Sequence, residues 1–263
     1  MKTNNTDFLV TKGYRLFQEF CAACKRDKYI GICFGSPGVG KTLSARHYSM
    51  WDDIEQIDPF FESSKYTPEL AGQKTVFYTP PVSNTPKRID DGLNDTLFKL
   101  QAVVYYGRES SENETDHDGS CELVIVDEAD RLTLHSLEHL RDRYDQEGFG
   151  LIVIGMPGIE KKISRYPQFY SRVGFSHAYK PLSEEEMEFV LKHHWEKLGL
   201  SLSLDDFTDR EAMASVVRVT SGNFRLVNRL FSQIQRIMEV NTLSSISKEV
   251  VEAARQCLVV GVN

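Results

Sequence analysis

The feature that most constrains the fold is a glycine-rich loop between an apolar segment and a helical one. Residues 29–42 read YIGICFGSPGVGKT, so that a short apolar run leads directly into GSPGVGKT. These last eight residues match G-x-x-x-x-G-K-[ST] at every position. Glycines let such a loop curl until its backbone N–H groups point at phosphate oxygens, and the helix that follows adds positive charge at its N-terminus. The stretch predicts a nucleotide-binding loop.

The side chains at the end of the loop have separate expected roles. Lys41 is expected to reach the β- and γ-phosphates and to take part in catalysis, and the Thr42 hydroxyl is expected to ligate Mg²⁺. ATP and Mg²⁺ are therefore the predicted cofactors. The residues expected to contact the nucleotide are Gly35, Ser36, Pro37, Gly38, Val39, Gly40, Lys41, Thr42 and Leu43. The alternative is a glycine-rich turn that matches by chance, and the flanking strand and helix argue against it.

Strand and helix patterns alternate after the loop. The further apolar segments that suit buried strands are 75–79, 123–128, 151–155 and 175–179, and Gly150 reads as a turn residue before the third of them. This alternation indicates a parallel sheet covered by helices on both faces. After a capping-box start at Ser183 the pattern is helical only. We predict an N-terminal helical segment over 1–28, an α/β nucleotide-binding domain over 29–181 and a helical lid over 182–263.

Composition places the chain among ordinary globular proteins, with 41% apolar and 26% charged residues in 263. No apolar run approaches the roughly 20 residues of a membrane span, and the start MKTNNT leads to no signal core, so we expect a cytoplasmic protein without a membrane partner. Cys21 and Cys24 form a single C-x-x-C without a second pair. This favours core or surface thiols over a metal-binding or redox site. The acidic segment 107–120 predicts an exposed loop. The net charge of −7 still permits a local basic strip for nucleic acid.

A second motif follows the four apolar residues 123–126. It begins with two acidic residues, Asp127 and Glu128. Asp127, at the C-terminal tip of a strand, can hold Mg²⁺ through water, and Glu128 is placed to orient or deprotonate an attacking water. The alternative is a strand that merely ends in two acids. The intact phosphate loop earlier in the chain favours the catalytic interpretation.

Together these motifs resemble those of the AAA+ ATPases, over roughly residues 10–260. The resemblance rests on the phosphate loop, the run DEADRL at 127–132 and the helical C-terminal module. DEADRL followed by GLIVIGMPGIEKKI is most similar to the DNA-transposition regulators of the MuB, TnsC and TniB type, while ExeA-like secretion ATPases and origin-binding initiators share parts of the pattern. The implied fold is α/β: an AAA+ P-loop NTPase with a parallel sheet flanked by helices and a C-terminal all-helical lid.

The resemblance also implies roles for single residues. Arg172, just before the fifth strand, has the place of the arginine finger, a catalytic group that acts on the γ-phosphate of a neighbouring subunit; Arg165 is the alternative. Arg225, in the segment GNFRLVNRL, resembles the second sensor, which reads the nucleotide from the lid. Gly155 and Met156 stand where many AAA+ proteins keep a polar sensor. Either hydrolysis is slow, or another group substitutes.

A site completed by a neighbouring subunit implies a homo-oligomer, either a ring or a helical filament. The resemblance then implies an ATPase whose hydrolysis is slow and is stimulated by assembly, DNA or a partner protein. It also implies that the protein oligomerises on double-stranded target DNA and recruits or activates a transposase. A target-selector protein is a further implied partner. The candidate DNA contacts, each of which could also be a solvated helix residue, are Lys87, Arg88, Lys161 and Lys162. The alternatives are a nucleotide-gated interaction switch with little turnover and an ATPase of secretion or replication initiation.

Overall fold

The computed structural model describes residues 8–58, 67–109 and 120–258. It divides the chain into two compact units. The first, here called the sheet unit, comprises Met1–Val10, Tyr14–Gly35 and Lys41–Tyr179; the second, the helical unit, comprises Thr11–Gly13, Ser36–Gly40 and Lys180–Asn263. The predicted loop at 107–120 lies largely outside the described residues. Its beginning, 107–109, continues a helix and is not a loop.

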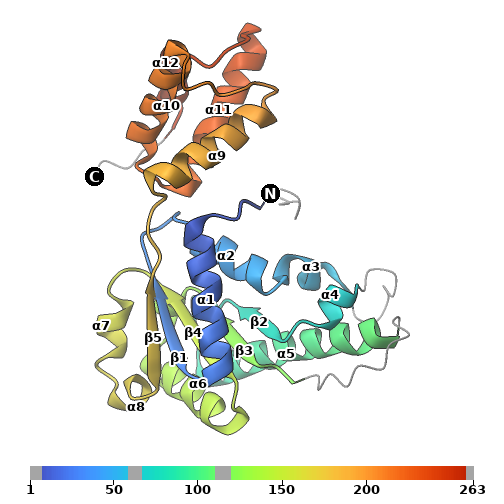
Figure 1. The fold of residues 1–263 in the computed structure, drawn as a ribbon. Coiled ribbons are helices and arrows are strands. Elements are labelled where there is room, and N and C mark those ends of the chain that lie inside the picture. Colours follow the sequence, from blue (N-terminus) through green and yellow to red (C-terminus); the bar gives the residue numbers. More distant parts are fainter. Residues whose placement is uncertain (1–7, 59–66, 110–119, 259–263) are drawn as a thin grey trace. The chain divides into compact units, whose positions relative to one another are not determined.

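The sheet unit is built on parallel strands in the order β2-β3-β4-β1-β5 (Figure 1). They are β1 (Ile30–Phe34), β2 (Thr75–Tyr78), β3 (Leu123–Val126), β4 (Gly150–Gly155) and β5 (Val173–Ala178). Every residue of β2, β3 and β4 is buried. A strand that is covered on both faces must be apolar throughout, which explains the unbroken runs LVIV and GLIVIG. The edge strand β5 instead alternates half-buried and exposed residues.

Helices connect these strands. They are α1 (Lys12–Asp27, in this unit from Tyr14), α2 (Lys41–Tyr48), α3 (Trp51–Gln56), α4 (Pro68–Ala71), α5 (Pro86–Glu109), the 3₁₀ turn η3 (Ala129–Arg131), α6 (Leu134–Glu147), α7 (Ile159–Ile163) and α8 (Pro167–Tyr170). Cys21 and Cys24 lie on the buried face of α1, and burial raises the pKa of the Cys24 thiol to about 12. In the described parts of the chain no three His, Cys, Asp or Glu side chains group as metal ligands.

Glycines allow α1 to lie directly on the sheet. A Cβ on Gly31 would be 2.5 Å from Cys24 Sγ, and one on Gly150 would be 2.4 Å from the carbonyl oxygen of Cys24. The second contact is with backbone, which cannot move aside as a side chain can. Gly150 is therefore the buried first residue of β4, and its assignment as a turn residue was wrong.

Because the strands are parallel, their C-terminal ends meet at one edge of the sheet. Phe34, the last residue of β1, pairs with Gly155, the last residue of β4. Val126, the last residue of β3, pairs with Val153 of β4. The residues that follow these three strand ends, namely the phosphate loop, Asp127 and Met156, therefore start at neighbouring points. This edge of the sheet is the candidate site.

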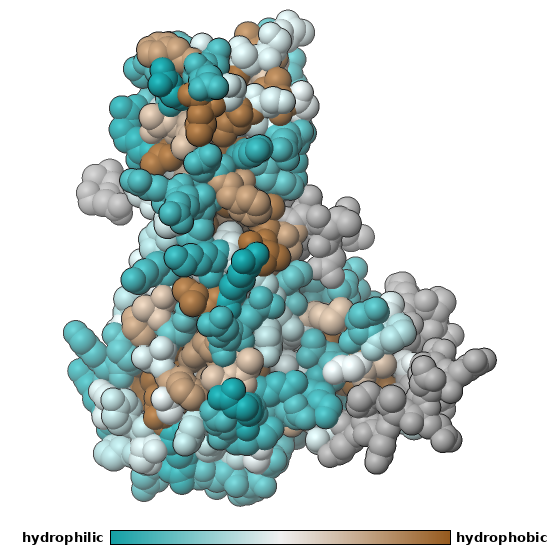
Figure 2. All heavy atoms as spheres, viewed as in Figure 1, coloured by the Kyte–Doolittle hydropathy of each residue, from teal (hydrophilic) through white to brown (hydrophobic). Residues whose placement is uncertain are grey.

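The helical unit contains α9 (Glu184–Lys197), α10 (Phe207–Thr220), α11 (Phe224–Asn241) and α12 (Lys248–Gln256). A side-chain oxygen caps the start of each helix, from Ser183, Asp206, Asn223 and Ser247 in turn. The Trp195 and Phe231 rings meet edge to face at 5.3 Å in the core between α9 and α11. Figure 2 shows a largely hydrophilic face on each unit, with apolar residues in small groups. Within the described ranges, no helix has the length and apolar character required to cross a bilayer.

Candidate functional site

The phosphate loop leaves β1 and enters α2 at Lys41. The Lys41 side chain is buried, and its Nζ donates a hydrogen bond of 2.6 Å to the carbonyl oxygen of Gly35. Burial lowers the pKa of Lys41, and the negative charges of Asp127, Asp130 and Glu128 act in the opposite direction. The ammonium group is therefore held at the start of the loop with carboxylates close by, as a phosphate-binding lysine requires.

Thr42 and Asp127 meet at the same edge. Thr42 Oγ1 donates a hydrogen bond of 2.7 Å to Asp127 Oδ2, and the N–H of Asp127 donates to the carbonyl oxygen of Tyr78 at 2.9 Å. Asp127 is only 4% exposed, and this burial raises its pKa. Hydroxyl and carboxylate oxygens are ligands that Mg²⁺ prefers, so these two residues fit the predicted metal site.

Asp127→Asn should stabilise the nucleotide-free protein at neutral pH. Because burial raises the pKa of Asp127, protonation favours the folded state, and this stability is lost as pH rises through the folded pKa. The amide keeps an acceptor for Thr42 and removes the buried charge. We expect Tm without nucleotide or Mg²⁺ to rise at pH 7, by about 2–4 °C per kcal/mol gained, and the gain to shrink toward acid pH. Equal Tm values for both proteins across the pH range would contradict it.

Glu128 begins the turn that follows β3. Its φ is 50°, in the left-handed region, and its side chain is exposed, with the carboxylate 4.0 Å from Arg131. The turn thus sends Glu128 into solvent directly after the buried Asp127. An exposed carboxylate can meet a water molecule, so this placement is compatible with the predicted role of Glu128 as a general base.

The tip of the phosphate loop belongs to the helical unit and is tied to the start of α11. The Arg225 N–H donates to the carbonyl oxygen of Gly38 at 2.9 Å, and Asn223 Nδ2 donates to that of Pro37 at 2.8 Å. Gly38 has φ 82°, and a Cβ there would be 2.5 Å from Asn223 Oδ1. The Arg225 side chain is exposed. The predicted sensor arginine therefore starts beside the loop, with its guanidinium in solvent.

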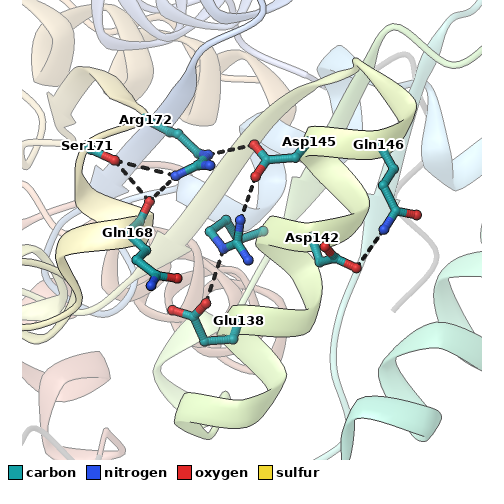
Figure 3. Close-up of polar contacts among 8 residues, drawn as sticks. Glu138, Asp142, Asp145, Gln146, Gln168, Ser171 and Arg172 are labelled. Carbon is teal, nitrogen blue, oxygen red and sulfur yellow. Dashed lines mark hydrogen bonds and ion pairs between the residues drawn. The ribbon is translucent and has the colours of Figure 1, made fainter.

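Arg172 lies at the N-terminal ends of the strands, whereas the candidate site lies at their C-terminal ends. Arg172 directly precedes β5, and its carbonyl oxygen accepts the N–H of Ile30 at the start of β1. Its Nε donates to Asp145 Oδ1 at 2.5 Å, and Figure 3 shows the two side chains pointing toward one another from α6 and the segment after α8. Asp145 also accepts from Arg141. A strand length separates Arg172 from the phosphate loop of its own chain, so the two groups do not share a site.

The candidate DNA-binding cations lie on helices that follow β2 and β4. Lys87 and Arg88 are exposed in the first turn of α5, and Arg88 Nη1 donates to the Ser83 carbonyl oxygen at 3.0 Å. Lys161 is exposed on α7, as is Arg165 just beyond this helix. Lys162 is instead half-buried, and its Nζ donates to the carbonyl oxygens of residues 130 and 132 at 2.9 Å each. Lys162 thus has a role in the turn after β3, whether or not it meets DNA.

Sequence reasoning overlooked Asp130 at the candidate site. Asp130 Oδ2 accepts the N–H of Met156 at 2.7 Å, so this carboxylate lies at the tip of β4. A signal was present in the sequence, since an acid in DEADRL and a missing polar residue after β4 can complement one another. Only the three-dimensional structure shows that the Asp130 carboxylate and the end of β4 lie together.

The fold and the placement of Lys41, Thr42, Asp127 and Glu128 define a P-loop NTPase of the AAA+ class. A sequence profile of the AAA domain family matches residues 24–163. A Staphylococcus aureus protein described as "Potential ATP-binding protein" is 47% identical over 269 residues, 99% of each chain. The chain therefore belongs to the AAA domain family.

Solved structures agree on the fold. The Thermotoga maritima RuvB Holliday junction branch migration motor superposes with a TM-score of 0.61 at 14% identity, covering 96% of this chain and 71% of that one. The Aeropyrum pernix ORC1 protein, solved in complex with DNA, gives 0.62 at 16% identity, covering 95% and 66%. The predicted fold class, a P-loop parallel sheet flanked by helices with a helical C-terminal region, is confirmed.

Proposed function

We propose that this protein is an Mg²⁺-dependent ATPase that oligomerises on double-stranded DNA and recruits or activates a transposase. ATP binding is supported by the AAA domain family and by the description of the Staphylococcus aureus relative, and the proposal adds hydrolysis, DNA binding and the transposase. The single observation that carries it is the position of Arg172 at the sheet edge opposite the phosphate loop. An arginine finger at that position would act on the nucleotide of another copy, so a complete site would require assembly.

The site residues support hydrolysis in the following way. Lys41 binds the β- and γ-phosphates, and Thr42 and Asp127 hold Mg²⁺, which neutralises charge on the transferring group when bound. Glu128 accepts a proton from water as the water oxygen bonds to the γ-phosphorus. The bond to the bridging oxygen breaks, and ADP leaves with that electron pair. Arg225 is proposed to read the γ-phosphate from α11.

DNA binding is supported by exposed cations and by one structural neighbour. Lys87, Arg88 and Lys161 are exposed on helices that begin near the candidate site, and such cations bind backbone phosphates without reading sequence. A structural neighbour, the ORC1 protein, was solved in complex with DNA. The transposase rests on the resemblance of residues 127–163 to transposition regulators.

Electron microscopy of the purified protein with duplex DNA tests the assembly. With a non-hydrolysable ATP analogue we expect ordered rings or filaments, which should be absent with ADP or without nucleotide. Lys87→Glu combined with Arg88→Glu should weaken DNA binding and make it less salt-dependent. The matched control is Lys192→Glu, at an exposed position on α9. Dispersed monomers in every condition would favour the alternative, a nucleotide-gated interaction switch.

Arg172→Ala should lower hydrolysis about 10²–10³-fold and weaken assembly, while monomer affinity for ATP stays within about twofold. The reason is that its guanidinium serves the neighbouring copy. Asp145 loses an ion pair in this variant, so Tm is measured as well. Arg165→Ala, at the exposed position that is the alternative finger, is the comparison. A collapse of monomer ATP affinity in Arg172→Ala would contradict the finger assignment.

A further inference from the structure

A carboxylate from another segment of the chain, that of Asp130, lies at the C-terminal end of β4. β4 ends at Gly155 and is followed by Met156, and neither residue has a polar side chain. Asp130 fills this place from the turn after β3. Its Oδ2 accepts the Met156 N–H at 2.7 Å, and a Cβ on Gly155 would be 2.6 Å from the same oxygen. Gly155 thus leaves the space that the Asp130 carboxylate occupies.

The turn that carries Asp130 is braced. Lys162 Nζ donates 2.9 Å hydrogen bonds to the carbonyl oxygens of Asp130 and Leu132, from α7, the helix that follows β4. The segments after β3 and β4 are therefore joined twice, through the Asp130 side chain and through the Asp130 backbone. No described residue donates a hydrogen bond to the second carboxylate oxygen, Oδ1. Oδ2 is therefore fixed by the Met156 N–H, and Oδ1 can accept a hydrogen bond from a water molecule.

The carboxylate lies beside the end of β1, from which the phosphate loop departs. Gly155 pairs with Phe34, the residue directly before Gly35, so the Asp130 oxygen stands next to the strand from which the loop departs. The charge of Asp130 also acts on the Lys41 ammonium, along with those of Asp127 and Glu128. Glu128 and Asp130 flank one alanine in the same turn. Both acids are thus at the sheet edge where the γ-phosphate of a bound nucleotide would lie.

We propose that Asp130 positions the attacking water, in place of a polar side chain at the end of β4. The role rests on the proposed ATPase function and deepens it. Met156 N–H fixes Oδ2, and Oδ1 accepts a hydrogen bond from the water whose other proton passes to Glu128. Asp130 itself gains no proton and forms no bond to phosphorus. Two acceptors on one water direct its lone pair at the γ-phosphorus.

A purely structural role is the competing explanation, since an acceptor for the Met156 N–H would brace the turn without touching water. Two substitutions separate the roles. Asp130→Asn keeps a carbonyl acceptor for Met156 and removes the charge. Gly155→Ala keeps the carboxylate and displaces it, because the new Cβ would be within 2.6 Å of Asp130 Oδ2 and 2.5 Å of Ile159 Cδ1, both at movable side-chain ends. Asp142→Asn, exposed on α6, is the matched control.

The experiment measures ATP turnover, affinity for a fluorescent ATP analogue, Tm, and hydrogen exchange at the Met156 amide in nucleotide-free protein. We expect Asp130→Asn and Gly155→Ala to lower kcat about 10–100-fold, with ATP affinity within about twofold and Tm unchanged in Asp130→Asn. The Met156 amide should stay protected in Asp130→Asn and exchange faster in Asp130→Ala. The control should match wild type in every measurement.

A kcat of Asp130→Asn equal to that of wild type would overturn the proposal. A parallel fall of kcat, ATP affinity and Tm in this variant would also overturn it, because Asp130 would then have a purely structural role. The ATPase proposal fails separately. If the wild-type chain binds ATP and releases no phosphate with or without DNA, hydrolysis itself is contradicted and the role of Asp130 with it. Turnover in wild type combined with full activity in Asp130→Asn contradicts Asp130 alone.

Discussion

Lys41→Ala should weaken ATP binding about 10²–10³-fold, the largest effect on affinity that we expect from any substitution in this chain. A charge-assisted hydrogen bond contributes about 1.5–3 kcal/mol, and Lys41 is expected to make such bonds to two phosphates. The ammonium group is already buried at the loop, so little reorganisation precedes binding. Isothermal titration calorimetry with ATP and Mg²⁺ measures the loss directly.

The truncation also removes the hydrogen bond from Lys41 Nζ to the carbonyl oxygen of Gly35. A buried carbonyl left without a donor costs about 1–3 kcal/mol, so Lys41→Ala could lose affinity through damage to the loop. Lys41→Met keeps the aliphatic stem and, like the alanine variant, removes both the charge and the donor to Gly35, so the Tm of the two variants measures the damage that loss of this hydrogen bond does to the loop. Circular dichroism and Tm must show both variants folded. Lys192→Ala on α9 is the exposed control. ATP affinity in a folded Lys41→Met equal to that of wild type would refute the role of Lys41.

Sequence alone could predict the sheet because its strands are buried on both faces. Such strands read as continuous apolar runs, and LVIV and GLIVIG were recognisable for this reason. The motif residues at the strand ends followed from that placement, since parallel strands bring their C-terminal ends to one edge. Short helices were harder. α7 and α8, of five and four residues, lack the length over which helical periodicity can be read.

Contacts between distant segments could not be predicted. Gly150 reads as a turn residue until the Cys24 backbone is seen against it. Asp130 has no marked role in DEADRL until its carboxylate is found at the Met156 amide. The same holds for Arg172, whose partner Asp145 lies on α6, a separate segment of the chain. Each of these pairings depends on the tertiary arrangement of elements, which a pattern along one segment does not contain.

Glu128→Gln should bind ATP like the wild-type protein and hydrolyse it about 10²–10⁴-fold more slowly, because the amide cannot accept the proton of the attacking water. Its side chain is exposed, and its one described ion pair, with Arg131, spans 4.0 Å. An exposed pair of this kind contributes about 0–1 kcal/mol, so Tm should change little. Single-turnover phosphate release, with ATP affinity and Tm measured in parallel, checks the expectation. The matched control is Glu188→Gln, exposed on α9.

The same variant separates the two functions that remain in competition. If hydrolysis releases the assembled state, Glu128→Gln with ATP should form assemblies on DNA that persist, while wild-type assemblies decay as ATP is consumed. If the protein is a switch with little turnover, wild-type and variant assemblies should persist equally, since no hydrolysis limits either. Rapid phosphate release by Glu128→Gln would contradict the low-turnover switch and the role of Glu128, because the proton would then have another acceptor. The lifetime of the complex on DNA, followed by light scattering, therefore decides whether Glu128 sets the duration of assembly.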